Sequence, residues 1–175
     1  MHGSTVDVRE TKDEALAGEL AALINVAYGA GEGDLFVAPR DRTSPQRVAE
    51  LIRAGGMLVA RRDDGRIAGC CAMQALGSDT VELGFMSSAP GDWGSGAGRA
   101  LVAAGEAWAV ARGAETILMK LLVPKAGEQP LKQRLREWYE RLGYSLERTA
   151  PFEDRDLAAP AEFLVFEKSV SDRPR

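Results

Sequence analysis

The chain has 175 residues and a formal net charge of -4 at pH 7, from 26 acidic and 22 basic residues. A net negative charge gives no general attraction to nucleic-acid phosphates or anionic membranes, so we expect neither as a partner. Hydrophobic residues make up 45% and charged residues 27%, a composition typical of globular proteins. The length predicts one domain over residues 1–170, followed by a loose tail over 171–175.

Cysteine and histidine usage argues against a metal site. Cys70 and Cys71 are adjacent in an apolar run, which suits neither a disulfide framework nor a zinc site. The only histidine, His2, is near the N-terminus, which does not favour a histidine base. No apolar run approaches 18 residues and the first residues lack a signal-peptide pattern, so we expect a cytoplasmic protein.

Apolar spacing and turn residues predict the elements of the first half of the chain. These are a strand over 4–11, helices over 13–29 and 44–56, and a hairpin over 57–76. Asp64-Gly65, between two apolar runs, is the strongest hairpin signal. The glycine-rich stretch 29–43 is predicted to be a binding loop or a lid.

The second half continues with alternating strands and helices. We expect strands over 80–88, 115–123, 144–152 and 161–170, and helices over 98–114 and 130–144. The continuous apolar run 115–123 suits a central strand covered on both faces, paired in parallel with 80–88. This order of elements predicts a single mixed α/β domain.

The segment MSSAPGDWGSGAGRAL, residues 86–101, is the most informative stretch. Gly94, Gly96 and Gly98 are spaced by two between a predicted strand and a predicted helix, so backbone amides there can point into one concavity. Such a site suits an anion such as a pyrophosphate. The segment lacks the third glycine of a dinucleotide fingerprint and the lysine of a P-loop, which excludes both motifs. By spacing alone, an ordinary strand-to-helix turn is an equally open interpretation.

Two stretches of the chain, VELGFMSSAPGDWGSGAGRAL at 81–101 and WYERLGY at 138–144, match motifs of a known family. They resemble motifs of the GNAT superfamily of acyl-CoA-dependent N-acyltransferases. The run VELGFMSSAPGDWGSGAGRAL, 81–101, is similar to the segment that joins that family's fourth strand to its pyrophosphate-binding helix. Gly96 and Gly98 match its glycines, whereas Trp93 occupies a position where the family has arginine or glutamine. WYERLGY, 138–144, resembles the end of the helix after the family's fifth strand. The resemblance implies a mixed, mostly antiparallel sheet of about seven strands with about four helices, in which strands four and five splay apart.

The resemblance also implies that acetyl-CoA is the co-substrate. The edge of the fourth strand would bind the pantetheine arm, and the amides of residues 94–99 would bind the pyrophosphate. Arg99 is either a phosphate partner or a solvated helix residue. Lys132 lies where the family often has asparagine. The expected cofactor-binding residues are Met86, Ser87, Ser88, Trp93, Gly94, Ser95, Gly96, Ala97, Gly98, Arg99 and Lys132.

The implied reaction moves an acetyl group to a primary amine of a small molecule. Tyr139 falls on the family's tyrosine near the cofactor sulfur and would donate a proton to the leaving thiolate. Glu82, on the fourth strand, is the expected general base or water-positioning carboxylate. The alternatives are a solvent-facing strand residue for Glu82 and a half-buried structural aromatic for Tyr139.

The acceptor is less well defined by the sequence. Two predicted loops carry an acidic set that would favour a cationic amine, or that is simply solvated: Glu32, Asp34, Glu153, Asp154 and Asp156. Acetylation of a protein N-terminus or lysine stays open, as does an acyl-CoA-binding regulatory module that has lost catalysis, suggested by Trp93 and Lys132. The oligomeric state is open as well, with a homodimer among the options.

Overall fold

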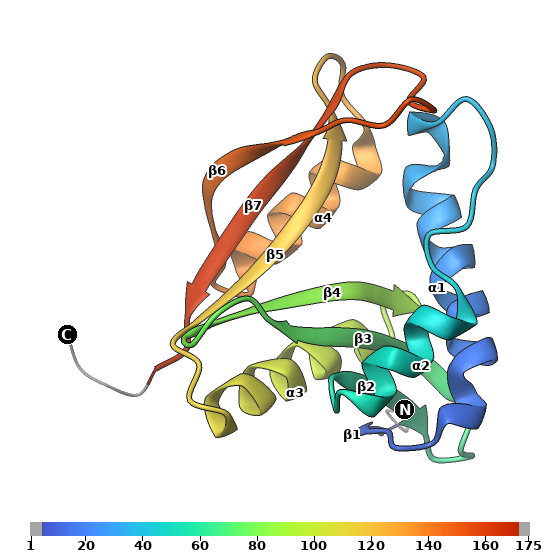
Figure 1. The fold of residues 1–175 in the computed structure, drawn as a ribbon, viewed down its shortest axis with the longest axis vertical. Helices are drawn as coiled ribbons and strands as arrows, with labels where there is room; N and C mark the ends of the chain where they lie inside the picture. The colour runs from blue at the N-terminus through green and yellow to red at the C-terminus, as the bar shows by residue number, and fades with distance from the viewer. Residues whose placement is uncertain (1–4, 172–175) are drawn as a thin grey trace.

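The computed structural model describes residues 5–171, so His2 and the predicted tail beyond Ser171 lie outside the described residues. The elements in chain order are β1 (Val6–Glu10), a 3-10 turn (Glu14–Leu16), α1 (Ala17–Glu32), a second 3-10 turn (Gly33–Leu35), α2 (Pro45–Arg53), β2 (Met57–Arg62), β3 (Ile67–Ala75), β4 (Thr80–Ser88), α3 (Ala97–Ala111), β5 (Thr116–Pro124), α4 (Pro130–Arg141), β6 (Ser145–Phe152) and β7 (Ala161–Ser169) (Figure 1). The predicted order of strands and helices is confirmed. None of the helices within 5–171 has the length and apolar character needed to cross a membrane.

The described strands form one sheet in the order β1-β2-β3-β4-β5-β7-β6. Neighbouring strands are antiparallel except β4 and β5, which run parallel. These two strands pair only from Thr80 opposite Thr116 to Glu82 opposite Leu118, and then they diverge (Figure 1). The prediction of a mixed, mostly antiparallel sheet with splayed fourth and fifth strands is therefore confirmed.

Helices cover both faces of the sheet. In β2, Met57 and Val59 pack in the cluster with α1 and α2, whereas Leu58 and Ala60 pack in the cluster with α3. Because successive strand side chains point to opposite faces, a strand covered on both faces needs an unbroken apolar run. This requirement explains why the middle strands show little alternation in the sequence.

The first helix is longer than predicted. The sequence predicts that the helix ends at Gly29 and that a binding loop or a lid follows, but α1 continues to Glu32. Gly29 and Gly31 do not adopt a positive φ, and a Cβ at Gly31 would lie 3.9 Å from Leu131 of α4. The low helix propensity of these glycines therefore does not end α1 at Gly29. As a consequence, Glu32 is held on a helix end rather than in a loop.

Strand β4 has a bulge that the sequence did not indicate. The pairing with β3 shifts between Cys70 opposite Ser87 and Ala72 opposite Gly84. Inside this shift Phe85 has φ +48°, a left-handed conformation rare for a bulky residue, and its carbonyl accepts a 3.0 Å hydrogen bond from Ser87 Oγ. Bulges of this kind often lie next to active sites and redirect the strand. Here the bulge lies where β4 turns away from β5.

Candidate active site

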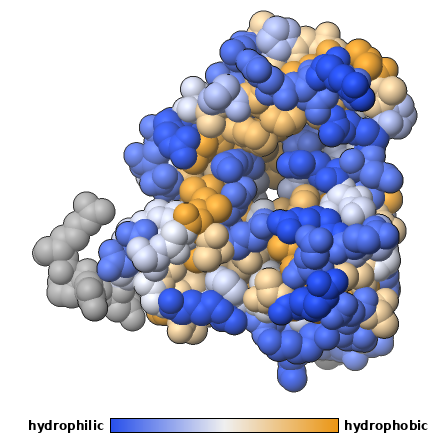
Figure 2. All heavy atoms as spheres, in the orientation of Figure 1, coloured by the Kyte–Doolittle hydropathy of each residue, from blue (hydrophilic) through white to orange (hydrophobic). Residues whose placement is uncertain are grey.

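A cavity of about 450 Å³, called here the main cavity, opens between the diverging ends of β4 and β5. In Figure 2 the surface is hollowed between the two halves of the molecule. The lining of the main cavity includes Tyr139 and the following predicted cofactor residues: Met86, Ser88, Trp93, Gly94, Gly96, Gly98, Arg99 and Lys132. The other three predicted residues, Ser87, Ser95 and Ala97, are outside this lining in the described chain.

The glycine segment, residues 91–98, presents backbone amides at the start of α3. Gly94 and Gly96 have φ values of +75° and +91°, which only glycine adopts without strain. The amides of Ser95 and Ala97 donate within the segment, at 3.2 and 3.4 Å. The remaining amides of residues 94–99 have no acceptor among the described residues: Gly94, Gly96, Gly98 and Arg99. Amides at a helix N-terminus without a partner are suited to an anion, so four of the six amides in the predicted cradle 94–99 are available to a pyrophosphate.

A buried ion pair, missed from the sequence, holds the glycine segment to β2. Asp92 is only 3% exposed, and Arg62 Nε donates to its Oδ1 at 2.6 Å, with Arg62 Nη2 contacting the same oxygen. Asp92 also lines the main cavity. An unpaired carboxylate there would repel an anion, and Arg62 neutralises it.

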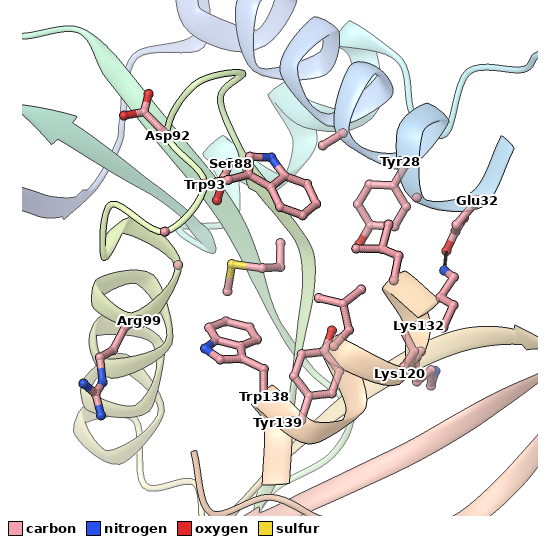
Figure 3. Close-up of a pocket in the computed structure, with 18 of the residues that line it drawn as sticks. Tyr28, Glu32, Ser88, Asp92, Trp93, Arg99, Lys120, Lys132, Trp138 and Tyr139 are labelled. Atoms are coloured by element: carbon pink, nitrogen blue, oxygen red, sulfur yellow. Dashed lines mark ion pairs between the residues drawn. The ribbon is translucent and has the colours of Figure 1, made fainter. Parts of the chain in front are cut away.

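Two tryptophans flank the main cavity on opposite sides (Figure 3). Trp93 is 60% exposed, and its indole offers a single N–H donor at the position where the family has arginine or glutamine. A Cβ at Gly98 would lie 3.4 Å from the Trp138 ring, so glycine there permits the close approach of α3 and α4. Arg99 is exposed, and its side chain extends along α3 away from Tyr139 in Figure 3.

Tyr139 lies where the main cavity meets a smaller one of about 240 Å³, since it lines both. We call the smaller one the inner acceptor cavity because it also contains Glu32, one of the acidic residues that the sequence predicts to attract the acceptor amine. Its ring packs edge-on against Phe166 at 5.3 Å and is 6% exposed. The hydroxyl has no hydrogen-bond partner among the described residues. Burial, with a smaller effect of Glu32, raises the pKa of Tyr139 to about 12. The phenol therefore stays protonated at neutral pH and can act as a donor.

Glu82 lines the inner acceptor cavity together with Tyr139. It is the last β4 residue that pairs with β5, so it lies where the two strands begin to diverge. Lys120 of β5 donates to Glu82 Oε2 at 3.2 Å. The two predicted catalytic residues thus face one cavity, and Glu82 is ion-paired there.

A second carboxylate, Glu32, faces both cavities and was not predicted as catalytic. It is 8% exposed and lies 3.9 Å from Lys132 Nζ (dashed in Figure 3) and 3.7 Å from Arg42 Nε. Burial raises the pKa of Glu32 and lowers that of Lys132, while each charge opposes the shift of the other. Ile24, Tyr28 and Glu32 are spaced by four residues, as on one face of a helix. This spacing is the sequence signal that could have placed Glu32 on α1.

The predicted acidic set is divided by the fold. Glu32, Asp34 and Asp154 line a third cavity of about 800 Å³, the outer acceptor cavity, whereas Glu153 and Asp156 do not. Arg40 Nη1 donates to Asp154 Oδ2 at 2.6 Å, and this hydrogen bond lowers the pKa of Asp154. The acidic loop residues therefore do not form one continuous site for a cationic amine.

Comparisons with known proteins agree with this geometry. Solved structures with the same fold include an aminoglycoside 6'-N-acetyltransferase complexed with coenzyme A (TM-score 0.75, 18% identity, covering 98% of this chain and 99% of that chain). A Salmonella typhimurium protein with its cofactor acetyl-CoA (0.71, 14%, 97% and 96%) and a GNAT-family protein from Desulfovibrio desulfuricans (0.69, 22%, 95% and 100%) are also similar. At such identities the likeness shows the fold alone. The search of curated proteins finds no match.

The family assignment rests on a model of the sequence family. The acetyltransferase (GNAT) family model matches residues 19–144, which is more than half of the chain. That range contains the glycine segment, Glu82, Lys132 and Tyr139. The chain therefore belongs to the GNAT acetyltransferase family.

Proposed function

We propose that this protein transfers the acetyl group of acetyl-CoA to a primary amine of a small molecule. The observation that carries the proposal is the position of the Tyr139 hydroxyl, without a hydrogen-bond partner, between the main cavity and the inner acceptor cavity. The solved structures with coenzyme A and acetyl-CoA, and the aminoglycoside acetyltransferase among them, support both the co-substrate and the class of acceptor. The cytoplasmic location expected from the sequence belongs to this proposal, and cell fractionation tests it.

The hydrogen-bond donors that line the main cavity suit the phosphates and the pantetheine arm of acetyl-CoA. The unpartnered amides of Gly94, Gly96 and Gly98 would hold the pyrophosphate at the start of α3. The backbone of Met86 and Ser88, on the free edge of β4, would bind the pantetheine arm as an added strand does. Arg62 keeps the nearby Asp92 charge neutralised.

In the proposed reaction the amine nitrogen forms a bond to the acetyl carbon while the carbon–sulfur bond breaks. Glu82 takes the proton that the amine must lose, directly or through a water molecule. Tyr139 donates toward the departing sulfur. A phenol with a pKa of about 12 is a weaker acid than a thiol near about 8.5, so its main contribution is a hydrogen bond to the developing thiolate.

The direct test is release of free thiol from acetyl-CoA in the presence of a panel of amines. We expect turnover with at least one small amine, and a loss of about 100-fold in kcat for Glu82→Gln. Glu147→Gln, an exposed change on β6, is the matched control and should leave kcat unchanged. Binding of acetyl-CoA without turnover of any amine would instead indicate the acyl-CoA-binding regulatory module. Turnover only of protein lysines or N-termini would show that the acceptor is a protein and not a small molecule.

A further inference from the structure

Glu32 and Arg42 form a loose pair of opposite charges on the acceptor side. Both line the inner acceptor cavity that Tyr139 also lines. Arg42 Nε lies 3.7 Å from Glu32 Oε2, which is beyond hydrogen-bond distance. The guanidinium makes no hydrogen bond to any described residue; it lies over the Tyr28 and Phe85 rings, with its Cζ 5.3 and 5.8 Å from their centroids.

The position of Arg42 is set by its backbone. Asn25 Oδ1, on α1, accepts hydrogen bonds from the amides of Arg42 and Thr43 at 2.7 and 2.9 Å, and its Nδ2 donates to the Thr43 carbonyl at 3.0 Å. The rings below the guanidinium restrict the side chain further. Arg42 thus stands beside the inner acceptor cavity with its side chain 39% exposed and its donors unused by any described residue, so little reorganisation is needed for it to bind a ligand.

The charges around the inner acceptor cavity are balanced. Its carboxylates are Glu32 and Glu82, and its cations are Arg42 and Lys120, of which Lys120 binds Glu82. The carboxylates that line only the outer acceptor cavity, among them Asp34, do not share a cavity with Tyr139. A polycation would therefore gain little beside Tyr139.

We propose that the acceptor is an α-amino acid, whose carboxylate binds the Arg42 guanidinium and whose amine lies on Glu32. This inference rests on the proposed function and names its substrate class. An α-amino acid carries its amine and its carboxylate on one carbon. Its positive amine can therefore face Glu32 while its negative carboxylate faces Arg42. A guanidinium binds a carboxylate through two parallel hydrogen bonds, which gives both strength and orientation. Tyr28, Phe85 and Phe163 surround the remaining space and favour an apolar side chain.

The recognition also places the amine for the reaction. Glu32 faces the main cavity as well as the inner acceptor cavity, so an amine held by it is directed toward the side where the acetyl group would lie. The bonds formed and broken are those of the proposed acetyl transfer: carbon–nitrogen forms, carbon–sulfur breaks, and the amine proton goes to Glu82 or to water.

The test compares matched acceptors with the wild-type protein and acetyl-CoA. Each α-amino acid is assayed beside its α-amide and its decarboxylated amine, together with an aminoglycoside, and acetylated products are quantified by mass spectrometry. We expect kcat/KM for the best amino acid to exceed that of its amide and amine by about 100-fold, because these analogues leave Arg42 unpaired. Arg42→Gln should reduce kcat/KM for the amino acid to the level of the amine without changing the amine's own value.

Two further variants separate recognition from folding. Arg42→Lys keeps the charge but not the paired donors, so it should retain only part of the preference for the amino acid. Arg53→Gln, on the surface of α2 and paired with Glu14, should change neither value. Equal turnover of amines or aminoglycosides and amino acids overturns the inference while the proposed function stands. Acetyl-CoA binding with no acetylation of any acceptor overturns both.

Discussion

Arg62→Gln should destabilise the fold and weaken acetyl-CoA binding at the same time. The Asp92 carboxylate is 3% exposed and the Arg62 side chain 13%, so the pair is almost entirely removed from water. Removing one partner of a buried ion pair costs about 3–5 kcal/mol, because the other charge stays buried without compensation. For a domain of this size, that loss corresponds to a fall in Tm of about 6–20 °C.

The assay is urea and thermal unfolding, combined with calorimetric titration of acetyl-CoA. Arg62→Gln leaves an unpaired negative charge beside the proposed pyrophosphate site, so the Kd should rise about tenfold, or 1.4 kcal/mol. Asp92→Asn also destabilises the fold, but it leaves a cation, so its Kd should not rise. The double variant should recover most of the lost stability, since neither charge is then buried alone.

Arg66→Gln is the matched control, because its partner Asp64 is 3.9 Å away and both side chains are more than half exposed. An exposed pair of this kind contributes about 0–1 kcal/mol. The reasoning is refuted if Arg62→Gln is no less stable than this control, or if both single variants weaken acetyl-CoA binding equally.

The remaining predictions concern the tyrosines and a glycine of the sheet. Tyr139→Phe removes only the proposed donor, so kcat should fall about 100-fold while the KM for acetyl-CoA is nearly unchanged. The control is Tyr144, whose hydroxyl donates to Glu106 outside the cavities. Tyr144→Phe should cost about 1 kcal/mol of stability and leave kcat unchanged. Full activity of Tyr139→Phe would contradict its role. Burial raises the pKa of Tyr28, Tyr139 and Tyr144 and of both cysteine thiols, so the unfolded chain releases these protons at a lower pH than the native state. Stability should therefore be intact below about pH 8.5 and fall steadily toward about pH 12, which urea unfolding across this range measures; a flat profile would be inconsistent with neutral buried groups. A Cβ at Gly69 would lie 2.5 Å from a backbone oxygen of β4, whereas one at Gly77 would meet no heavy atom within 4 Å. Gly69→Ala should thus lose about 3 kcal/mol in unfolding experiments and Gly77→Ala almost nothing; equal losses would show that the close approach of β3 and β4 is unimportant.

Local spacing in the sequence was enough to determine the elements and their order. Strands and helices place side chains with periods of 2 and 3.6 residues, so apolar spacing, Pro45 and Pro130 at helix starts and Gly65 in the hairpin are all readable locally. The glycine segment and WYERLGY were sufficient for the family resemblance, because backbone conformation and a short motif are also local properties. Nine of the 19 residues lining the main cavity were predicted from these local patterns.

Only the tertiary structure decided which charges meet. Arg62 and Asp92 lie 30 residues apart in the chain, and Glu32 contacts Lys132 and Arg42 only because α1 continues through two glycines to pack beside α4. The bulge at Phe85 likewise depends on the pairing of β3 with β4. Burial and the distance between opposite charges set the pKa values and the energies of these pairs, and both quantities exist only after folding brings distant segments together.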